Sequence, residues 1–275
     1  MTKTSNVQQL QAIAKKTRRE IIEMITAAKS GHPGGSLSAV EILVELYFNT
    51  MRIDPANPKW ADRDRFILSK GHAAPVLYSV MAEIGYPDTP KDKLNTLRTF
   101  GSVYQGHPDM RFIPSLEAST GSLGQGLSLG MGMALGARLD GRPSRIYVML
   151  GDGEIQEGQV WEAAMAAPFH KVDNLVAIVD YNGIQLDGFV KDIMDVAPLA
   201  DKWRSFNWHV IELDGHDPKA VRAAFGEAAA TKGKPTCLVA HTIKGKGVSF
   251  MENNPKFHGV APTQDELKLA LQELN

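Results

Sequence analysis

The stretches RIYVMLGDG at residues 145–153 and NLVAIVDYNG at residues 174–183 decide the fold. Each is an apolar run of strand length that ends in glycine and an oxygen-bearing side chain, Asp152 in the first and Asn182 in the second. The two side chains are about 30 residues apart, the length of one strand–helix–strand unit. We therefore expect neighbouring parallel strands whose carboxyl ends bring both side chains to one sheet edge.

The rest of the chain continues this alternation of strands and helices. Further strands are expected at residues 65–69, 208–213 and 235–241. Helices are expected at residues 6–29, 73–84, 157–167, 218–230 and 263–274. A glycine-rich stretch at residues 120–126 opens a further helix that runs to about residue 137. Ser36 is expected to cap one more helix. Residues 86–117 have an irregular pattern. The fold class is therefore α/β, with a mostly parallel sheet covered by helices on both faces, in a single domain over residues 1–275.

Composition limits the function classes. Hydrophobic residues make up 43% of the chain and charged residues 22%, as in globular proteins, and the formal net charge of −1 gives no overall cationic field for nucleic acid or a membrane surface. Cys237 is the single cysteine, and the N-terminus lacks the apolar core of a signal peptide, so we expect a cytoplasmic protein. The uncharged residues 118–137 contain six glycines, which favours a buried loop and helix over a membrane span.

The polar residues after the two central strands suggest a metal site. The sequence has neither a GxGxxG nor a GxxxxGK[ST] phosphate loop. Asp152 and Asn182 together form a partial site for Mg²⁺, which often takes its other ligands from water and a phosphorylated molecule. Gly153 would let the backbone approach that molecule closely. The alternative is structural, with Asp152 capping a helix and Asn182 shaping a turn.

Short segments in a fixed order give the chain a family resemblance. From about residue 6 to residue 262 it resembles the N-terminal, diphosphate-binding domain of transketolase, and GDG followed by Asn182 resembles the thiamine-diphosphate motif. Each segment alone is weak, whereas the ordered set is specific. The matching segments are SGHPG at 30–34, SKGH at 69–72, GHP at 106–108, TGSLGQG at 120–126, GDGEIQEG at 151–158, NGI at 182–184, KGKG at 244–247, and His258.

This resemblance implies a cofactor and the residues that hold it. The implied cofactor is thiamine diphosphate with Mg²⁺, or with Ca²⁺ or Mn²⁺ in its place. Asp152 and Asn182 would bind the metal through their side chains and Ile184 through its carbonyl. His72 and Gly153 would hold the diphosphate. The other implied cofactor contacts are Gly121, Ser122, Leu123, Asn182, Lys244 and His258.

The resemblance also implies a reaction of carbohydrate metabolism, in which a two-carbon ketol unit passes from a ketose or ketose phosphate to an aldose. His32 and His258 would face the donor's C3 hydroxyl, and His107 would bind its C1 hydroxyl. Histidine suits both proton transfer and stabilisation of alkoxide charge, and the sequence leaves both roles open. The remaining histidines, for which no such role is expected, are His170, His209, His216 and His241.

The resemblance covers one part of a transketolase. No segment of this chain resembles the pyrimidine-binding domain, which supplies an activating glutamate, or the C-terminal domain. We therefore expect the N-terminal subunit of a split transketolase, paired with a C-terminal subunit in a heterotetramer that acts on sugar phosphates. The amphipathic pattern of residues 264–274 favours a natural chain end over a fragment. Glu157 matches either an interface glutamate or a first-turn acid, and both remain open.

Three other functions share part of this pattern. They are the alpha subunit of a 2-oxoacid dehydrogenase's decarboxylating component, the first domain of a deoxyxylulose-phosphate synthase, and a non-catalytic subunit that binds the cofactor. The glycine-flanked histidines His32, His72, His107 and His258 favour the transketolase interpretation.

Overall fold

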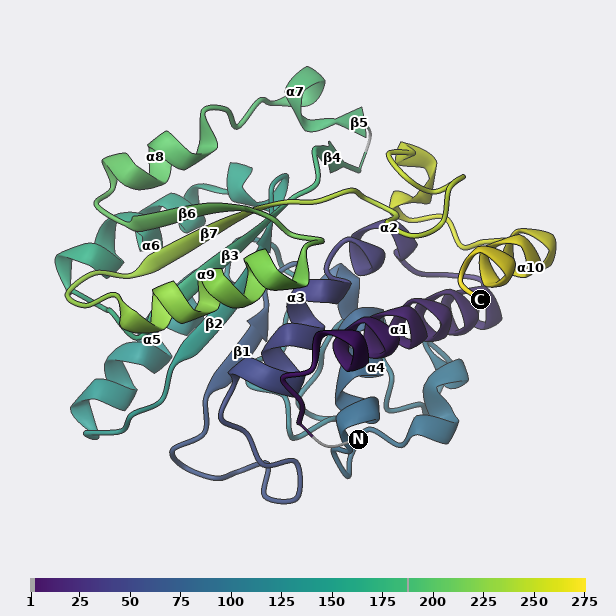
Figure 1. Ribbon diagram of the computed structural model, residues 1–275, viewed down its shortest axis with the longest axis horizontal. Coiled ribbons are helices and arrows are strands. Elements are labelled where there is room, and N and C mark those ends of the chain that lie inside the picture. The colour runs from purple at the N-terminus through teal and green to yellow at the C-terminus, as the bar shows by residue number, and fades with distance from the viewer. Residues whose placement is uncertain (1–2, 187) are drawn as a thin grey trace.

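The computed structural model describes residues 3–186 and 188–275 (Figure 1). Its centre is a five-stranded sheet in the order β1-β2-β3-β7-β6, and every neighbouring pair is parallel. The strands are β1 (Arg65–Leu68), β2 (Ile146–Gly151), β3 (Leu175–Tyr181), β6 (His209–Asp214) and β7 (Thr236–His241). This arrangement confirms the expected fold class.

Helices cover both faces of the sheet. One face carries α1 (Val7–Ala28), α3 (Val40–Glu45), α4 (Ala74–Ile84) and α9 (Pro218–Ala230), and α10 (Gln264–Glu273) lies against α1 (Figure 1). The opposite face carries α5 (Gly126–Leu139), α6 (Gly158–Phe169) and α8 (Leu199–Ser205). The shorter helical segments are α2 (Pro33–Leu37), η1 (Leu46–Thr50), η2 (Gly71–Ala73), η3 (Lys91–Thr96), η4 (Glu154–Gln156), α7 (Val190–Ile193) and η5 (Pro255–His258).

Two hydrophobic cores explain why strand β2 is apolar and buried along its whole length. In β2, Tyr147 and Met149 belong to the core beneath α1, α3 and α4. Ile146, Val148 and Leu150 belong to the core beneath α5 and α6. Because successive strand residues point to opposite faces, a sheet buried on both sides needs an apolar residue at each position.

Most expected helices and strands lie within two residues of their predicted bounds, but two predictions are wrong. Ser36 does not cap a helix: α2 begins at Pro33, whose fixed φ suits a first turn, and the Ser36 hydroxyl donates to the His32 carbonyl at 2.8 Å. The uncharged stretch at 118–137 is only partly buried, because α5 packs one face on β2 and exposes the other. No specific prediction covered the antiparallel pair β4 (Ile184–Gln185) and β5 (Gly188–Phe189), or α7 and α8.

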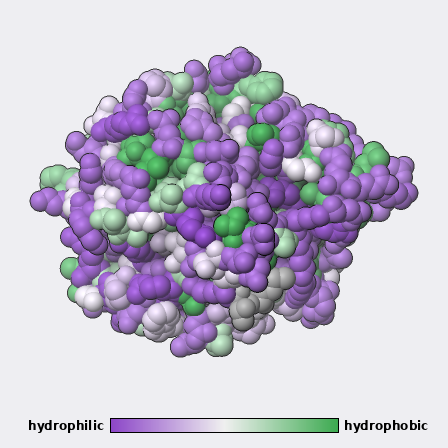
Figure 2. Space-filling view, viewed as in Figure 1, coloured by the Kyte–Doolittle hydropathy of each residue, from purple (hydrophilic) through white to green (hydrophobic). Residues whose placement is uncertain are grey.

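The surface is unevenly apolar. The face viewed in Figure 1 is mostly hydrophilic, with hydrophobic residues in small separate groups (Figure 2). By contrast, Leu129 and Leu139 on α5, and Met165 and Phe169 on α6, are between 44% and 88% exposed. Among the described residues, no helix has the length and apolar character that crossing a membrane requires.

Glycines on the two faces of α5 provide a test of this packing. A Cβ at Gly130 would lie 2.3 Å from Cγ2 of Val148 in β2, whereas a Cβ at Gly132 would meet nothing within 4 Å. Gly130→Ala should lower the free energy of unfolding by about 1–3 kcal/mol through overpacking. Gly132→Ala should raise it by up to about 1 kcal/mol through helix propensity. Urea unfolding measures both, and equal stability of the two variants would contradict this packing.

Candidate functional site

Polar loops gather at the carboxyl edge of the sheet. In the β2–β3 register, Gly151 pairs with Asp180, so Asp152 and Asn182 leave neighbouring strands at the same edge. The backbone N–H of Asp152 donates to the Asp180 carbonyl at 3.3 Å. The loop that carries Lys244 follows β7, which lies directly beside β3. Strands from distant parts of the sequence thus deliver their polar residues to one place.

Three oxygen-bearing groups that could bind a metal ion lie in this corner. Asp152 is 2% exposed, and its two carboxylate oxygens accept the backbone N–H groups of Gly153 at 2.8 Å and Gly183 at 2.5 Å. The Asn182 side-chain oxygen accepts the Ile184 N–H at 3.2 Å, and the Ile184 carbonyl accepts the Lys244 ammonium at 2.7 Å. The structure thus brings together Asp152, Asn182 and Ile184.

These donors fit a small, hard cation. Burial, and then the charge of Asp180, raises the pKa of Asp152 to about 6, so its ionised form lacks sufficient compensating charge in the protein. A carboxylate, an amide oxygen and a carbonyl suit Mg²⁺ and leave positions for oxygens from water and a ligand. Within the described ranges, no three His, Cys, Asp or Glu side chains gather as a metal site.

Three imidazoles lie together beside these oxygens. The ring centroids of His32, His72 and His258 are 5.2–5.5 Å apart, and His72 and His258 are stacked. Nζ of Lys244 lies 2.8 Å from Nδ1 of His258. Because an ammonium only donates, Nδ1 of His258 must accept and its ring proton must lie on Nε2. Nδ1 of His32 is buried with no protein partner, and so has hydrogen-bonding capacity for a ligand.

Burial keeps these imidazoles neutral near pH 7. It lowers the pKa of His32 to about 4, with a further contribution from Arg98. It lowers the pKa of His258 to about 3, assisted by Lys244, and holds that of His72 well below its usual value. The same cause lowers the pKa of Lys244 to about 8. The site therefore contains neutral imidazoles next to a cation.

Close backbone approaches require glycine at two positions. Gly121 has φ of 141°, and a Cβ there would lie 3.1 Å from the ring of His107. A Cβ at Gly34 would lie 2.9 Å from Cγ of Lys244 and from the Phe257 carbonyl. Ser122 and Leu123 follow Gly121 at the rim and are exposed, with Leu123 36% exposed. Gly121 thus lies against His107, and the next two residues of the predicted loop are exposed to solvent.

A buried ion pair beneath the site has no counterpart in the sequence predictions. Asp180 accepts hydrogen bonds from Lys70, Thr242, Ser38 at 2.6 Å and the Asn182 amide at 3.0 Å. The Lys70 and Asp180 side chains are at most 1% exposed. One signal was available, because a charged residue within or next to an apolar strand needs a buried partner.

Glu154 also ties the loops of the site together and was not predicted. Its carboxylate accepts the backbone N–H groups of Gly151 at 3.0 Å and Gly124 at 2.9 Å, together with the hydroxyl of Ser69. Burial raises the pKa of this carboxyl group. These bonds connect the loops that follow β1 and β2 to the glycine-rich loop before α5.

Arg98 is a further residue that the sequence did not single out, since it lies in the irregular stretch at 86–117. It has φ of 59°, and its guanidinium donates to the Ser30 hydroxyl at 3.1 Å. The pKa of His107 is lowered by burial and then by the Arg98 charge, which also contributes to the low pKa of His32. Arg98 thus adds positive charge at the histidine side of the site.

The remaining histidines lie outside this cluster. His209 pairs with Glu227 at 3.0 Å, His241 lies 3.5 Å from Glu212, and His216 bonds to Glu41. The fourth, His170, is at the C-cap of α6. Glu157 is exposed at the N-cap of α6 and its side chain makes no capping hydrogen bond.

The fold and the site define an α/β domain that presents oxygen ligands and clustered imidazoles at the carboxyl edge of a parallel sheet. The profile of the family "Transketolase, thiamine diphosphate binding domain" matches residues 9–275, so the chain belongs to the transketolase family.

Relatives of two lengths match this chain. It is 45% identical to the 6-deoxy-6-sulfo-D-fructose transketolase subunit SqwG of Clostridium sp. (strain MSTE9), covering 96% of each chain. It is 40% identical to one of the subunits of an apulose-4-phosphate transketolase from Phocaeicola vulgatus, covering 98% of this chain and 95% of that one. The crystal structure of Campylobacter jejuni transketolase superposes with a TM-score of 0.93 at 32% identity, over 98% of this chain and 43% of that chain.

These similarities confirm the expected family, the α/β fold and the thiamine diphosphate cofactor. They also confirm the assignment to the transketolase transferases and to the N-terminal subunit of a split form, and they do not favour the alternative functions.

The influence of Arg98 on the histidines can be measured directly. Arg98→Met removes a positive charge that disfavours the protonated imidazoles, so the pKa values of His32 and His107 should both rise. NMR titration of the imidazole C–H signals measures these values. Arg111→Met is the matched control, since Arg111 is 83% exposed and pairs with Asp109. Unchanged pKa values in Arg98→Met would refute the proximity of this charge.

Proposed function

We propose that this chain is the cofactor-binding subunit of a two-chain transketolase, which moves a two-carbon ketol unit from a ketose or ketose phosphate to an aldose. One observation carries this proposal: neutral His32, His72 and His258 lie beside the oxygen donors of Asp152 and Asn182 at the carboxyl edge of a parallel sheet. Ligands of open α/β sheets bind at this edge.

In this proposal, Asp152, Asn182 and Ile184 hold Mg²⁺, Ca²⁺ or Mn²⁺ through oxygen. The diphosphate lies against His72 and Gly153. The loop of Gly121, Ser122 and Leu123 contacts the rings of the cofactor, and Lys244 and His258 make further contacts with the cofactor. When bound, thiamine diphosphate supplies the electron sink for cleavage of a C–C bond beside a carbonyl.

The histidines handle the protons of the substrate. His32 is unprotonated near pH 7 and has an unpartnered Nδ1, so we assign it as the acceptor for the proton of the donor's C3 hydroxyl. His258 carries its ring proton on Nε2 because Lys244 occupies Nδ1, so it suits a donor that stabilises alkoxide charge at the same oxygen. His107 binds the C1 hydroxyl.

The partner is a C-terminal transketolase subunit that supplies the pyrimidine-binding domain and the activating glutamate. In this proposal residues 1–275 form one domain, and two copies of each subunit form a heterotetramer in the cytoplasm. The exposed apolar residues on α5 and α6, which Glu157 adjoins, support a protein interface on this face. The relatives named as subunits support a two-chain enzyme.

Reconstitution tests the proposed function. The chain, combined with its C-terminal subunit, thiamine diphosphate and Mg²⁺, should transfer a ketol unit from xylulose phosphate to an aldose phosphate. Neither of the two chains should be active by itself. Activity with pyruvate as donor in place of the ketose would overturn the proposal in favour of a 2-oxoacid dehydrogenase subunit.

The metal assignment predicts the effect of Asp152→Ala. Loss of the single carboxylate ligand should weaken thiamine diphosphate binding in the presence of Mg²⁺ by about 100-fold or more. Calorimetric titration of the complex measures this affinity. Asp173→Asn is the control, because Asp173 lies just before the amino end of β3, away from the site, where its carboxylate accepts the Gly233 N–H. Equal affinity in the two variants would refute the metal site.

The role of His258 predicts a different pattern. His258→Ala should weaken cofactor affinity far less than Asp152→Ala, because the metal and diphosphate contacts remain, and should lower kcat by about 100-fold to 10,000-fold, because the lost group acts on the substrate's protons. Steady-state kinetics at saturating cofactor measure the effect, with His170→Ala as the surface control. Normal turnover in His258→Ala would remove this residue from the mechanism.

A further inference from the structure

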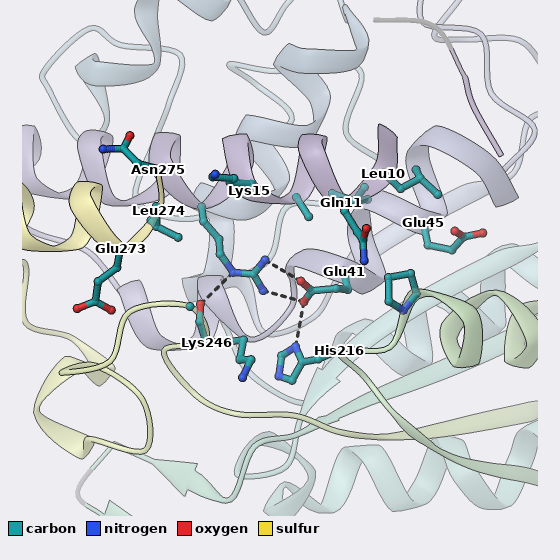
Figure 3. Close-up of a pocket in the computed structure, with 15 residues that line it drawn as sticks. Leu10, Gln11, Lys15, Glu41, Glu45, His216, Lys246, Glu273, Leu274 and Asn275 are labelled. Atoms are coloured by element: carbon teal, nitrogen blue, oxygen red, sulfur yellow. Dashed lines mark hydrogen bonds and ion pairs between the residues drawn. The ribbon is translucent and has the colours of Figure 1, made fainter. Parts of the chain in front are cut away.

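A second cavity of about 480 Å³ lies away from the cofactor site, between α1, α3 and the C-terminal end of α10. Its wall contains Arg18, Glu41 and His216, which come from three distant parts of the sequence (Figure 3). We call these three residues the Arg18–Glu41–His216 relay. Figure 3 shows Glu41 beside His216, with Lys246 close to both.

The first two members form a nearly buried ion pair. The Arg18 guanidinium contacts both Glu41 oxygens, at 2.6 Å and 2.8 Å, and its Nε–H donates to the Lys246 carbonyl at 2.9 Å. Burial by itself would raise the pKa of Glu41, but the hydrogen bonds and charges of His216 and Arg18 hold it at about 2. Glu41 is therefore ionised at neutral pH and acts as a fixed acceptor.

The third member has a defined tautomer. Nδ1 of His216 lies 2.9 Å from the Glu41 carboxylate, and its Nε2 accepts the backbone N–H of Ile243 at 2.8 Å. A carboxylate requires a donor, so Nδ1 carries the proton, whereas a backbone N–H requires an acceptor, so Nε2 carries none. Both nitrogens of the ring are thus fixed by partners of opposite character.

The hydrogen bond between His216 and Ile243 acts next to the cofactor site, because Ile243 directly precedes Lys244. The Lys244 ammonium contacts the Ile184 carbonyl and Nδ1 of His258, and its side chain is buried. The relay holds this loop on both sides of Lys244, through the N–H of Ile243 and the carbonyl of Lys246. The loop is tied a third time where the Gly245 N–H donates to the Gly34 carbonyl at 3.0 Å.

We propose that His216 is a positioning residue for the cofactor site, which fixes the backbone before Lys244 through its unprotonated Nε2, and that Glu41 and Arg18 hold its ring in that tautomer. This inference rests on the proposed role of Lys244 as a cofactor contact. His216 touches neither the oxygen donors nor the three clustered imidazoles, so its effect passes through Lys244.

Three variants of the full chain with its C-terminal subunit test this inference. His216→Ala removes the acceptor for the Ile243 N–H, whereas His216→Gln presents a side-chain carbonyl oxygen in its place. His209→Ala is the matched control, since His209 is also a histidine of the β6 region that pairs with a glutamate, but at the opposite end of the strand.

Two measurements are needed. Hydrogen exchange of the Ile243 amide reports on the proposed bond without any cofactor, and calorimetric titration with thiamine diphosphate and Mg²⁺ reports on the site. His216→Ala should speed exchange at Ile243 and weaken cofactor affinity by about threefold to tenfold, the value of one hydrogen bond. His216→Gln should recover most of both effects, and His209→Ala should change neither.

The Lys244→Met background separates this inference from the proposed function. There, His216→Ala should cause no further loss of cofactor affinity, because its effect requires the ammonium. If Lys244→Met alone leaves cofactor affinity unchanged, the proposed contact of Lys244 fails. If Lys244→Met weakens binding but His216→Ala does not, or if His216→Ala weakens it equally in both backgrounds, the positioning role of His216 is overturned.

Discussion

The buried ion pair between Lys70 and Asp180 is the interaction on which the site depends. Two charges removed from water are tolerated only when their geometry and hydrogen bonds compensate for the lost hydration. Asp180 meets this requirement by accepting from Ser38, Thr242 and the Asn182 amide as well as from Lys70. The last of these contacts has a chemical consequence. Because the side-chain nitrogen of Asn182 donates to Asp180, the orientation of the amide is fixed and its oxygen is the atom available to a metal ion.

The charges above this pair are arranged for an anionic ligand with its own cation. Asp152 stays short of compensating charge, whereas the imidazoles of His32 and His258 are kept neutral by burial and by nearby cations. A metal ion would supply the missing positive charge at the oxygen donors without protonating the histidines. Under the proposed function, the histidines that act on the substrate and the oxygen atoms that hold the metal thus occupy adjacent regions with different electrostatic demands.

The parts of this structure that follow from local pattern could be read from the sequence, and those that depend on distant partners could not. Apolar runs predicted all five strands, and the parallel connection predicted that Asp152 and Asn182 would meet. Arg98 lies in a segment without periodicity, and Glu154 acts by joining loops far apart in the chain. The Ser36 cap was wrong because Pro33 already starts that helix, and the exposed face of α5 depends on what its glycines pack against. Lys70 and Asp180 offered a usable signal, since charges beside apolar strands demand partners.

The strand order also bears on how the protein is made. β7 is the last strand to be synthesised, yet it lies between β3 and β6 in the middle region of the sheet. A nascent chain that has emerged only through β6 leaves both of those edges unpaired and exposes backbone groups that can join another chain. The same interval lacks Thr242 and Lys244, so their hydrogen bonds to Asp180 and Ile184 form only after β7 has been synthesised.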